Sequence, residues 1–172
     1  VGVAYTYDAA GRMIAMAETD SATQNSQSAE WRYDVDALGR RIGETSPQGR
    51  RTELALDAVG RATSVRQLVS DSTWITTTYG YDAAGRRTRF TDGRGNTTWT
   101  TYNALGLQAT VVEPITDAHP DLLDRTWSFS YDAAGALVRE VQPGGVVINR
   151  VYDTLGRPLT ESGSGPGVAA AS

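Results

Sequence analysis

Alternating apolar and polar residues along the chain predict a series of short β-strands. Trp127, Phe129 and Tyr131 alternate with serines, a period of two residues that is typical of a strand with two different faces. The segments at 76–79 and 97–101 are rich in threonine and aromatic residues, which favour strands. No segment sustains apolar residues at helical spacing, so we predict no helix. Further strands are expected at 13–16, 62–65 and 137–141.

A six-residue core recurs between these segments. The sequence YDAAGR stands at 7–12 and again at 81–86, and five variants complete a set of seven. From one core to the next the chain advances by 28, 21, 25, 21, 29 and 21 residues. The 21-residue step suits two strands of about seven residues with two turns, whereas two packed helices need more than about 30 residues. The chain is therefore predicted to be an array of β-hairpins. The other cores lie at 35–40, 56–61, 102–107, 131–136 and 152–157.

Each core has the composition of a tight hairpin turn. Its Asp is expected to accept hydrogen bonds from backbone N–H groups two residues further on. Its Gly, present in all seven cores, suits a position with positive φ that starts the return strand with a bulge. The turn positions predicted in this way are Tyr7, Asp8, Gly11, Arg12, Asp36, Gly39, Asp57, Gly60, Tyr81, Asp82, Gly85, Arg86, Tyr102, Gly106, Tyr131, Asp132, Gly135, Tyr152, Asp153 and Gly156.

The segments between the cores predict the turns at the other ends of the strands. Pro- and Gly-containing return turns at 46–49, 92–96 and 142–145 fall in the 21-residue steps, and the longer steps carry polar insertions. Residues 1–161 are expected to form one all-β segment of about fourteen antiparallel strands, and residues 162–172 a Gly/Ser/Pro/Ala-rich linker or frayed tail. Because such a sheet must curl or close and many strand positions are polar, we expect a thin curved strip with one face on a large lumen. The insertions lie at 19–29, 69–73 and 113–124.

The composition narrows the classes of function. All 16 basic residues are Arg, cysteine is absent, and the formal net charge is −4. This argues against a nucleic-acid binder, which would carry a basic stripe, and leaves no thiol or catalytic lysine. The sequence has no run of about 18 apolar residues, so we predict no membrane-spanning helix. We expect no cofactor, no metal ion and no catalytic residue in this chain.

The seven Y-D-x-x-G-R cores, with their 21-residue base step and Pro/Gly return turns, resemble the RHS/YD-repeat family over roughly residues 3–161. This family includes bacterial RHS polymorphic toxins, the shell-forming subunits of Tc toxin complexes and the YD shell of teneurins. The resemblance implies a β-sheet strip that spirals into a hollow cocoon around a polypeptide, commonly the toxin domain at the C-terminus of the same chain. The absence of cysteine and the Ala- and Arg-rich composition look more like a bacterial member.

The resemblance also implies partners and a location. The partners would be the rest of the same RHS shell, the encapsulated C-terminal toxin domain, and a delivery component such as a type VI spike or a Tc-toxin translocation subunit. The protein would be made in a bacterial cytoplasm and secreted. Family members that release their cargo cut themselves at a motif with an Asp-Pro pair and catalytic Asp residues. No Asp-Pro pair occurs here, so we expect a non-enzymatic, internal slice of shell wall.

The same residues allow other interpretations. The repeated Asp residues could hold a metal or a sugar, but turn capping is favoured because Asn103 replaces Asp in one core. The Arg after each Gly could bind an anion, or pair with a neighbouring Asp or stack on a cross-strand Tyr. Trp99 and Trp127 could bind glycan, which would make the chain a cell-surface carbohydrate-binding or adhesion module. His119, the only histidine, is expected in a solvated loop rather than a metal site.

Overall fold

The computed structural model describes residues 2–19 and 29–166. Within these residues the regular elements are fourteen β-strands and two short 3-10 segments, and the strands pair antiparallel. The predicted fold class, all-β with antiparallel hairpins, is confirmed. Most of the insertion at 19–29 and the end of the predicted tail lie outside the described residues. The chain divides into two compact units, Val1–Tyr79 and Gly80–Ser172.

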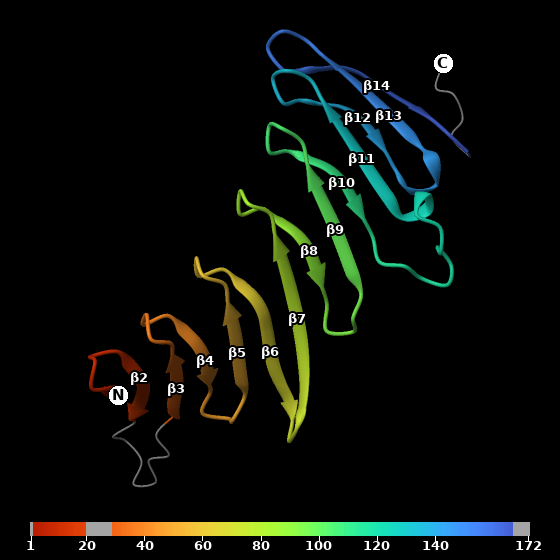
Figure 1. Ribbon diagram of the computed structural model, residues 1–172. Coiled ribbons are helices and arrows are strands. Elements are labelled where there is room, and N and C mark those ends of the chain that lie inside the picture. Colours follow the sequence, from red (N-terminus) through yellow and green to blue (C-terminus); the bar gives the residue numbers. More distant parts are fainter. Residues whose placement is uncertain (1, 20–28, 167–172) are drawn as a thin grey trace. The chain divides into compact units, whose positions relative to one another are not determined.

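The first unit is a meander in which each strand pairs with the strands before and after it in the chain (Figure 1). One of the predicted insertions, at 69–73, is different from what we expected. It lengthens both strands of one hairpin to nine residues and leaves only Asp71 and Ser72 as the turn, whereas the 21-residue step at 87–102 has strands of five and six residues. The strands are β1 (Gly2–Tyr7), β2 (Met13–Thr19), β3 (Ala29–Val35), β4 (Arg41–Thr45), β5 (Arg51–Leu56), β6 (Ala62–Ser70) and β7 (Thr73–Tyr81).

The second unit repeats this arrangement with shorter strands. The predicted insertion at 113–124 is a long loop that ends in a 3-10 turn, as expected for an insertion between strands. The sheet continues beyond the predicted boundary at residue 161, since Ser162 pairs with Asn149 and Ser164 with Val147. The elements are β8 (Arg87–Thr91), β9 (Thr97–Tyr102), β10 (Gln108–Val112), η1 (Leu123–Arg125), β11 (Thr126–Tyr131), β12 (Leu137–Val141), η2 (Pro143–Gly145), β13 (Val147–Tyr152) and β14 (Pro158–Ser164).

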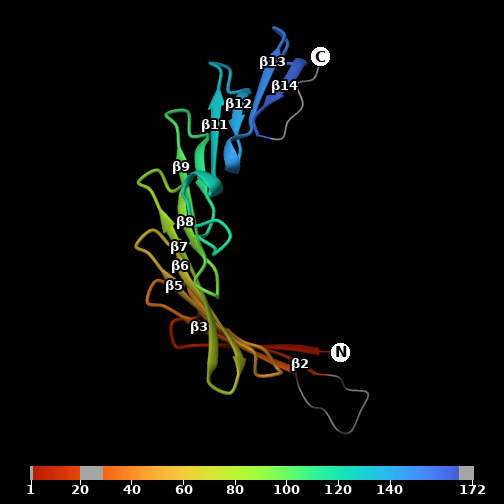
Figure 2. The same cartoon turned by 90° about the vertical axis from the view of Figure 1, so that its right-hand side faces the viewer.

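Each unit is a single layer of sheet without a closed core (Figure 2). Among the described residues only Ala15, Gly43 and Ser46 are buried, and Ala15 and Ser46 each keep 8% of their surface exposed. The sheets are therefore held by their backbone hydrogen bonds and by cross-strand side-chain pairs, each of which contributes roughly 0.2–1 kcal/mol. The prediction of a thin sheet rather than a sandwich agrees with this burial.

Register gives the first unit two chemically different faces. Tyr5 lies opposite Met16, and Met16 lies opposite Trp31, so an aromatic and apolar row crosses three strands on one face. On the other face Thr45 lies opposite Arg32 on one side and Arg51 on the other. Since side chains alternate between faces along a strand, Arg32 and Arg51 lie on the face away from the apolar row.

Candidate functional site

The seven core turns share one hydrogen-bonding pattern, which the turn at Asp36 illustrates. The N–H of Asp36 donates to the carbonyl of Arg40 at 2.9 Å, and the N–H of Gly39 donates back to the carbonyl of Asp36 at 3.0 Å. The carboxylate of Asp36 accepts from the N–H groups of Leu38 and Arg40, both at 2.9 Å. Its second oxygen accepts from Nε of Arg40 at 2.6 Å. One carboxylate thus closes the turn through three donors.

The glycine of each core has the backbone conformation that the sequence suggested. Its φ lies between +75° and +91° in all seven turns, in the left-handed region where a Cβ is penalised. The paired strands shift register next to six of these turns, as a bulge requires. These glycines are Gly11, Gly39, Gly60, Gly85, Gly106, Gly135 and Gly156.

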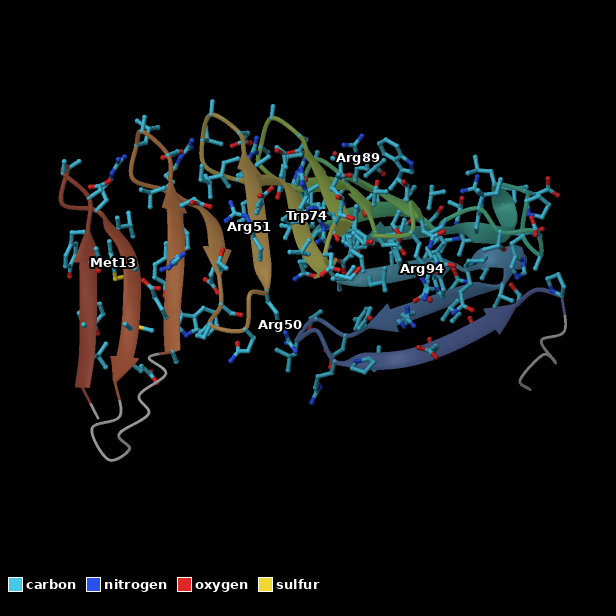
Figure 3. All side chains as sticks on the ribbon, turned by 90° about the horizontal axis from the view of Figure 1, so that it is seen from below. Met13, Arg50, Arg51, Trp74, Arg89 and Arg94 are labelled. Carbon is cyan, nitrogen blue, oxygen red and sulfur yellow. The ribbon has the colours of Figure 1, made fainter. Side chains whose placement is uncertain are left out.

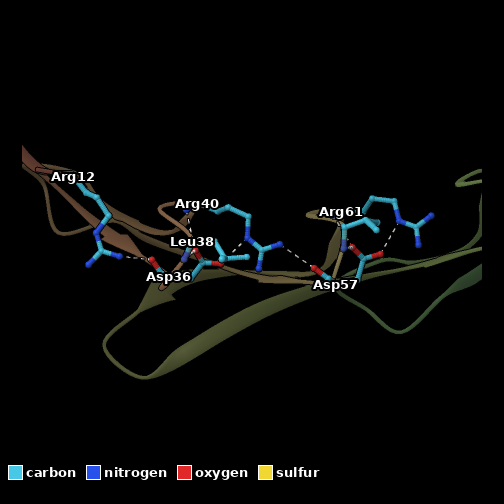
Figure 4. Close-up of polar contacts among 7 residues, drawn as sticks. Arg12, Asp36, Leu38, Arg40, Asp57 and Arg61 are labelled. Atoms are coloured by element: carbon cyan, nitrogen blue, oxygen red, sulfur yellow. Dashed lines mark hydrogen bonds and ion pairs between the residues drawn. The ribbon is translucent and has the colours of Figure 1, made fainter. Parts of the chain in front are cut away.

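The arginine of a core also reaches the next turn, which sequence analysis did not predict (Figure 4). Nη1 of Arg12 donates to the backbone carbonyl of Asp36 at 2.6 Å, and Nη1 of Arg40 donates to the carbonyl of Asp57 at 3.1 Å. In the second unit Arg86 makes the corresponding bond to Asn103 at 3.4 Å. The planar guanidinium can make both contacts because its donors point in several directions. Each such arginine therefore fastens one hairpin to its successor.

These arginines lie over the glycine of the next turn. A Cβ placed on Gly39 would be 3.6 Å from Cδ of Arg12, and one on Gly60 would be 3.6 Å from Nη1 of Arg40. Both distances are ordinary van der Waals contacts, so the arginine leaves room for a methyl group. The positive φ, rather than lack of space, is what selects glycine at these positions.

Two cores depart from the sequence pattern and show which parts of the turn are separable. In one, Asn103 Oδ1 accepts from the N–H groups of Leu105 and Leu107 at 3.0 Å, so an amide closes the turn as a carboxylate does. In the other, Asp132 accepts from the N–H groups of Ala134 and Ala136 at 2.9 and 2.8 Å, and Ala136 supplies no guanidinium. The backbone turn therefore forms without the ion pair.

Hydrogen bonding shifts the acidity of the turn carboxylates. The backbone N–H of Arg40 and then its guanidinium hold the pKa of Asp36 below its ordinary value, although partial desolvation opposes this. The pKa values of four other core Asp residues are lowered in the same way, by the backbone N–H and the guanidinium of the arginine four residues on. They are Asp8, Asp57, Asp82 and Asp153. These groups are used as turn acceptors, and no metal-ligand cluster of three or more occurs within residues 2–19 and 29–166.

The tyrosine that opens a core can tie its strand to the preceding strand. The hydroxyl of Tyr102 donates to the carbonyl of Arg87 at 3.0 Å, and the hydroxyl of Tyr152 donates to the carbonyl of Leu137 at 3.1 Å. The guanidinium of Arg86 lies 4.7 Å from the ring centre of Tyr102, a cation–π distance. Both alternatives for the core arginine, pairing with Asp and stacking on Tyr, therefore occur together in this turn.

The charged face of the first unit carries an ion-pair network across its strands (Arg51 and Trp74 in Figure 3). Arg51 contacts Asp34 at 2.7 Å and Glu53 at 2.9 Å, and Arg66 contacts Glu53 at 3.6 Å. The guanidinium of Arg66 lies 4.4 Å from the ring centre of Trp74. Hydrogen bonding from Glu53, with further contributions from Asp34, raises the pKa of Arg51. Because these side chains are partly exposed, each pair is worth only about 0.2–1 kcal/mol.

A glycine inside a strand makes this network possible. Asp34 on β3 and Arg51 on β5 are separated by β4, where Gly43 lies directly opposite Asp34. A Cβ on Gly43 would collide with the Asp34 carboxylate, so the missing side chain lets Asp34 reach across β4. Gly43 is not among the positive-φ residues, and its role is to permit this approach. The signal in the sequence was an isolated glycine between strand-forming residues, which we did not interpret.

The structure does not bring together the two tryptophans considered for glycan binding. Trp99 pairs with Val112, whereas Trp127 pairs with Val111 on the same strand. Adjacent residues of a strand point to opposite faces, so the two indoles lie on opposite faces of the sheet in the second unit. His119 is exposed in the 113–124 loop, as predicted, but that loop is ordered by internal hydrogen bonds.

The return turns have the same hydrogen-bond geometry as the core turns and lie at the opposite ends of the strands. The N–H of Asp92 donates to the carbonyl of Asn96 at 2.9 Å, and Asp92 Oδ1 accepts from the N–H groups of Arg94 and Asn96. Asn96 occupies the place of the core arginine and donates its amide to Asp92 at 2.9 Å. Corresponding backbone bonds close the turns at 46–50 and 142–146.

These features define a class of protein: a single-layer array of antiparallel hairpins with acid-closed glycine turns. No family model and no curated protein sequence matches the chain. Solved structures of Tc toxin complexes do match, and the resemblance to the RHS/YD-repeat family is confirmed at the level of the fold.

Three of the similar structures show how far this likeness extends. The crystal structure of TcdB2-TccC3 matches with a TM-score of 0.71 and 18% identity over 95% of this chain. The crystal structure of TcdB2-TccC3-Cdc42 matches with a TM-score of 0.70 and 18% identity over 94%. A Tc holotoxin pore of Photorhabdus luminescens with a substitution in TccC3 matches with a TM-score of 0.71 and 19% identity over 95%. The chain spans about 9% of the length of each of these structures.

Proposed function

We propose that this chain is a wall segment of an RHS-type cocoon that encapsulates and protects a C-terminal toxin polypeptide for secretion and delivery. The observation that carries the proposal is its fold: 95% of the chain aligns with part of the TcdB2-TccC3 structure. Its partners would be the rest of the same shell, the enclosed toxin domain, and a translocation subunit or type VI spike. Its site of action would be outside the producing cell.

The single-layer sheet supports a wall. A sheet with only Ala15, Gly43 and Ser46 buried among the described residues has two faces available, one for an interior and one for the outside. The first unit, with an apolar row on one face and an ion-pair network on the other, has the asymmetry that separates two such environments. No helix of the described residues is long and apolar enough to cross a membrane.

The proposal is tested on the full-length gene product that contains this chain. It is purified intact, its C-terminal fragment is found by mass spectrometry, and protease is added with and without denaturant. We expect a fragment that stays bound and resists digestion until denaturant opens the shell. The control is the same C-terminal fragment expressed alone, which should be digested at once. If both are digested at the same rate, the hairpins enclose nothing and the proposal fails.

The role proposed here is structural rather than enzymatic. The core carboxylates, which would be the candidate acids, are engaged with turn N–H groups and, in five cores, with arginine. We expect the purified 172-residue chain to keep its mass on prolonged incubation. A time-dependent pair of fragments in the mass spectrum, lost in a variant of one Asp, would instead show self-cleavage.

A further inference from the structure

A recess in the second unit stands apart from the turns described above. It lies at the strand ends that carry the return turns, where the loop after β10 comes close to η2. Both views of the chain show the two 3-10 segments side by side (Figures 1 and 2). Its volume is about 610 Å³, within the range of roughly 300–1,000 Å³ that is typical of small-ligand sites. Trp127, Glu113, Asp124, His119 and Gln142 line it, and we call it the loop recess.

The loop that forms one wall is held in place at its base. The N–H of Glu113 donates to the carbonyl of Arg125 at 2.8 Å, and Nη1 of Arg125 donates to the carbonyl of Glu113 at 2.9 Å. The hydroxyl of Thr126 donates to the carbonyl of Leu122 at 2.6 Å. Further along, the N–H of His119 donates to both oxygens of Thr116 at 3.1 Å. An insertion that only tolerated extra length would not need these bonds, so the loop presents its side chains in fixed positions.

Two side chains of the recess are oriented by hydrogen bonds that leave other atoms available. The indole N–H of Trp127 donates to Oε1 of Glu113 at 2.9 Å, which fixes the ring edge-on to that carboxylate and leaves the ring faces apolar. The amide nitrogen of Gln142 donates to Glu140 at 2.9 Å, so its carbonyl oxygen is the atom left to accept. The recess therefore combines an aromatic surface with several hydrogen-bond acceptors.

The charge of the recess selects among ligand classes. Glu113 and Asp124 line it, and no arginine of the described part of the chain lies within ion-pair distance of either carboxylate, whereas the core Asp residues of five turns are paired. Phosphate, sulfate and nucleic acid would be repelled by these carboxylates. A neutral ligand rich in hydroxyl groups would instead donate to them and lay its C–H face on the indole. Hydrogen bonds from neutral donors to charged acceptors are among the stronger ones.

We propose that the loop recess binds a neutral sugar ring. Trp127 provides the stacking surface, Glu113 and Asp124 accept hydrogen bonds from sugar hydroxyls, and Gln142 adds an acceptor at the opposite wall. This site is independent of the role of the sheet as a wall. It would give that wall a weak affinity for glycans wherever this edge of the sheet is accessible.

The test follows the indole N–H signal of Trp127 in the ¹⁵N-labelled 172-residue chain by NMR. A small, shallow site should bind a sugar with a Kd of about 1 mM. Glucose, galactose, N-acetylglucosamine, lactose and cellobiose are therefore each titrated to about 50 mM, well above that Kd. At least one sugar should shift the Trp127 signal saturably. The backbone amide signals of residues 113–124 are followed in the same titrations, because they report binding also in a variant that lacks the indole. Trp127→Ala and Asp124→Asn should each weaken binding, at least tenfold and about fivefold respectively. Trp99→Ala, on the opposite face, is the matched control and should bind normally.

Two outcomes overturn the proposal. If none of the five sugars shifts the Trp127 signal, the recess is not a sugar site. If arginine amide binds more tightly than every sugar and its binding disappears in 0.5 M NaCl, the carboxylates recognise a cation instead. Because Asp124 is exposed and makes no contact that holds the loop, Asp124→Asn keeps the test valid even if Trp127→Ala fails to fold. Neither outcome bears on the protease-protection result, so the two proposals fail separately.

Discussion

Replacing glycine by alanine at two positions of one hairpin should have different consequences for the stability of the chain. Gly39 lies in the turn between β3 and β4 with a φ of +79°, and Gly43 lies four residues further on, inside β4. At Gly39 the new Cβ has room, since its nearest contact is 3.6 Å away, but the backbone is left-handed. At Gly43 the backbone is ordinary, but the new Cβ meets the carboxylate of Asp34. The two substitutions therefore separate backbone strain from side-chain conflict.

The magnitudes follow from these two situations. A left-handed conformation costs a residue with a Cβ roughly 1–2 kcal/mol, so Gly39→Ala should lower the free energy of unfolding by about that much. Gly43→Ala should displace Asp34 and break its pair with Arg51, a loss of about 0.2–1 kcal/mol for a partly exposed pair. Alanine in a strand regains roughly 0.5–1 kcal/mol over glycine. The net effect of Gly43→Ala should therefore lie between a loss of about 0.5 and a gain of about 0.8 kcal/mol.

The assay is urea unfolding of the chain and its variants, followed by circular dichroism. The dependence of the unfolding free energy on urea concentration (the m-value) is fitted as one common value for all variants. A third variant, Gly39→Asn, is the matched control, because asparagine tolerates the left-handed region and should lose less stability than alanine. In an Asp34→Ala background the conflict disappears, and Gly43→Ala should become stabilising by about 0.5–1 kcal/mol. Equal losses for Gly39→Ala and Gly43→Ala, or no gain in the Asp34→Ala background, would refute this reasoning.

Three further predictions concern the turns. Folding lowers the pKa of Asp36 from its ordinary value of 3.8. The Asp36 carboxylate therefore contributes fully to stability above pH 3.8, and this contribution is lost as the pH falls below that value. The urea midpoint should drop less between pH 7 and pH 3 in Asp36→Asn than in the parent chain. Arg40→Lys removes the fork that joins two turns and should cost about 0.5–1.5 kcal/mol, more than Arg157→Lys, whose side chain is 73% exposed; similar losses in thermal melts would speak against the link. Ala136→Arg should supply the missing guanidinium partner of Asp132 and raise the free energy of unfolding by about 0.3–1 kcal/mol, and an unchanged or lower urea midpoint would contradict it.

Sequence analysis predicted the repeat, the strands and the turns because these depend on local chemistry. An Asp that can close a turn and a Gly that can adopt positive φ act within five residues, so their pattern along the chain is enough to place them. The spacing of 21 residues then gave the hairpin, and Figure 1 shows that hairpins follow one another as expected within each unit.

The contacts that sequence analysis missed all join residues of different hairpins or strands. The bond from Arg12 to the carbonyl of Asp36 spans 24 residues, and the bond from Arg51 to Asp34 crosses an intervening strand. Neither partner carries a local signal for the other, because register has to be known before the pairs can be found. The loop recess was missed for the same reason, since it combines residues of an insertion with a return turn of the next hairpin.

The same limit explains the one insertion that was interpreted wrongly. Four extra residues at 69–73 can either form a loop or lengthen the two paired strands. In the structure Gln67 pairs with Ile75 and Leu68 with Trp74, so apolar side chains on both strands continue the ladder. The tryptophan was the available signal, because an exposed loop tip rarely carries so large an aromatic residue.

Arg12, Arg40 and Arg86 each join one turn to the next, and such contacts between neighbouring hairpins let the chain be built from one hairpin at a time. Within each unit, strands contact the strands next to them in the chain, and the described residues contain no shared core that depends on the number of hairpins. The identical hexapeptides at 7–12 and 81–86 show that one unit can serve at different places along the array. Duplication or loss of a whole step at the gene level would therefore lengthen or shorten the sheet without disturbing its neighbours. A wall of this kind can change its size in evolution by one hairpin at a time, while the turn and the strand pairing of each hairpin stay the same.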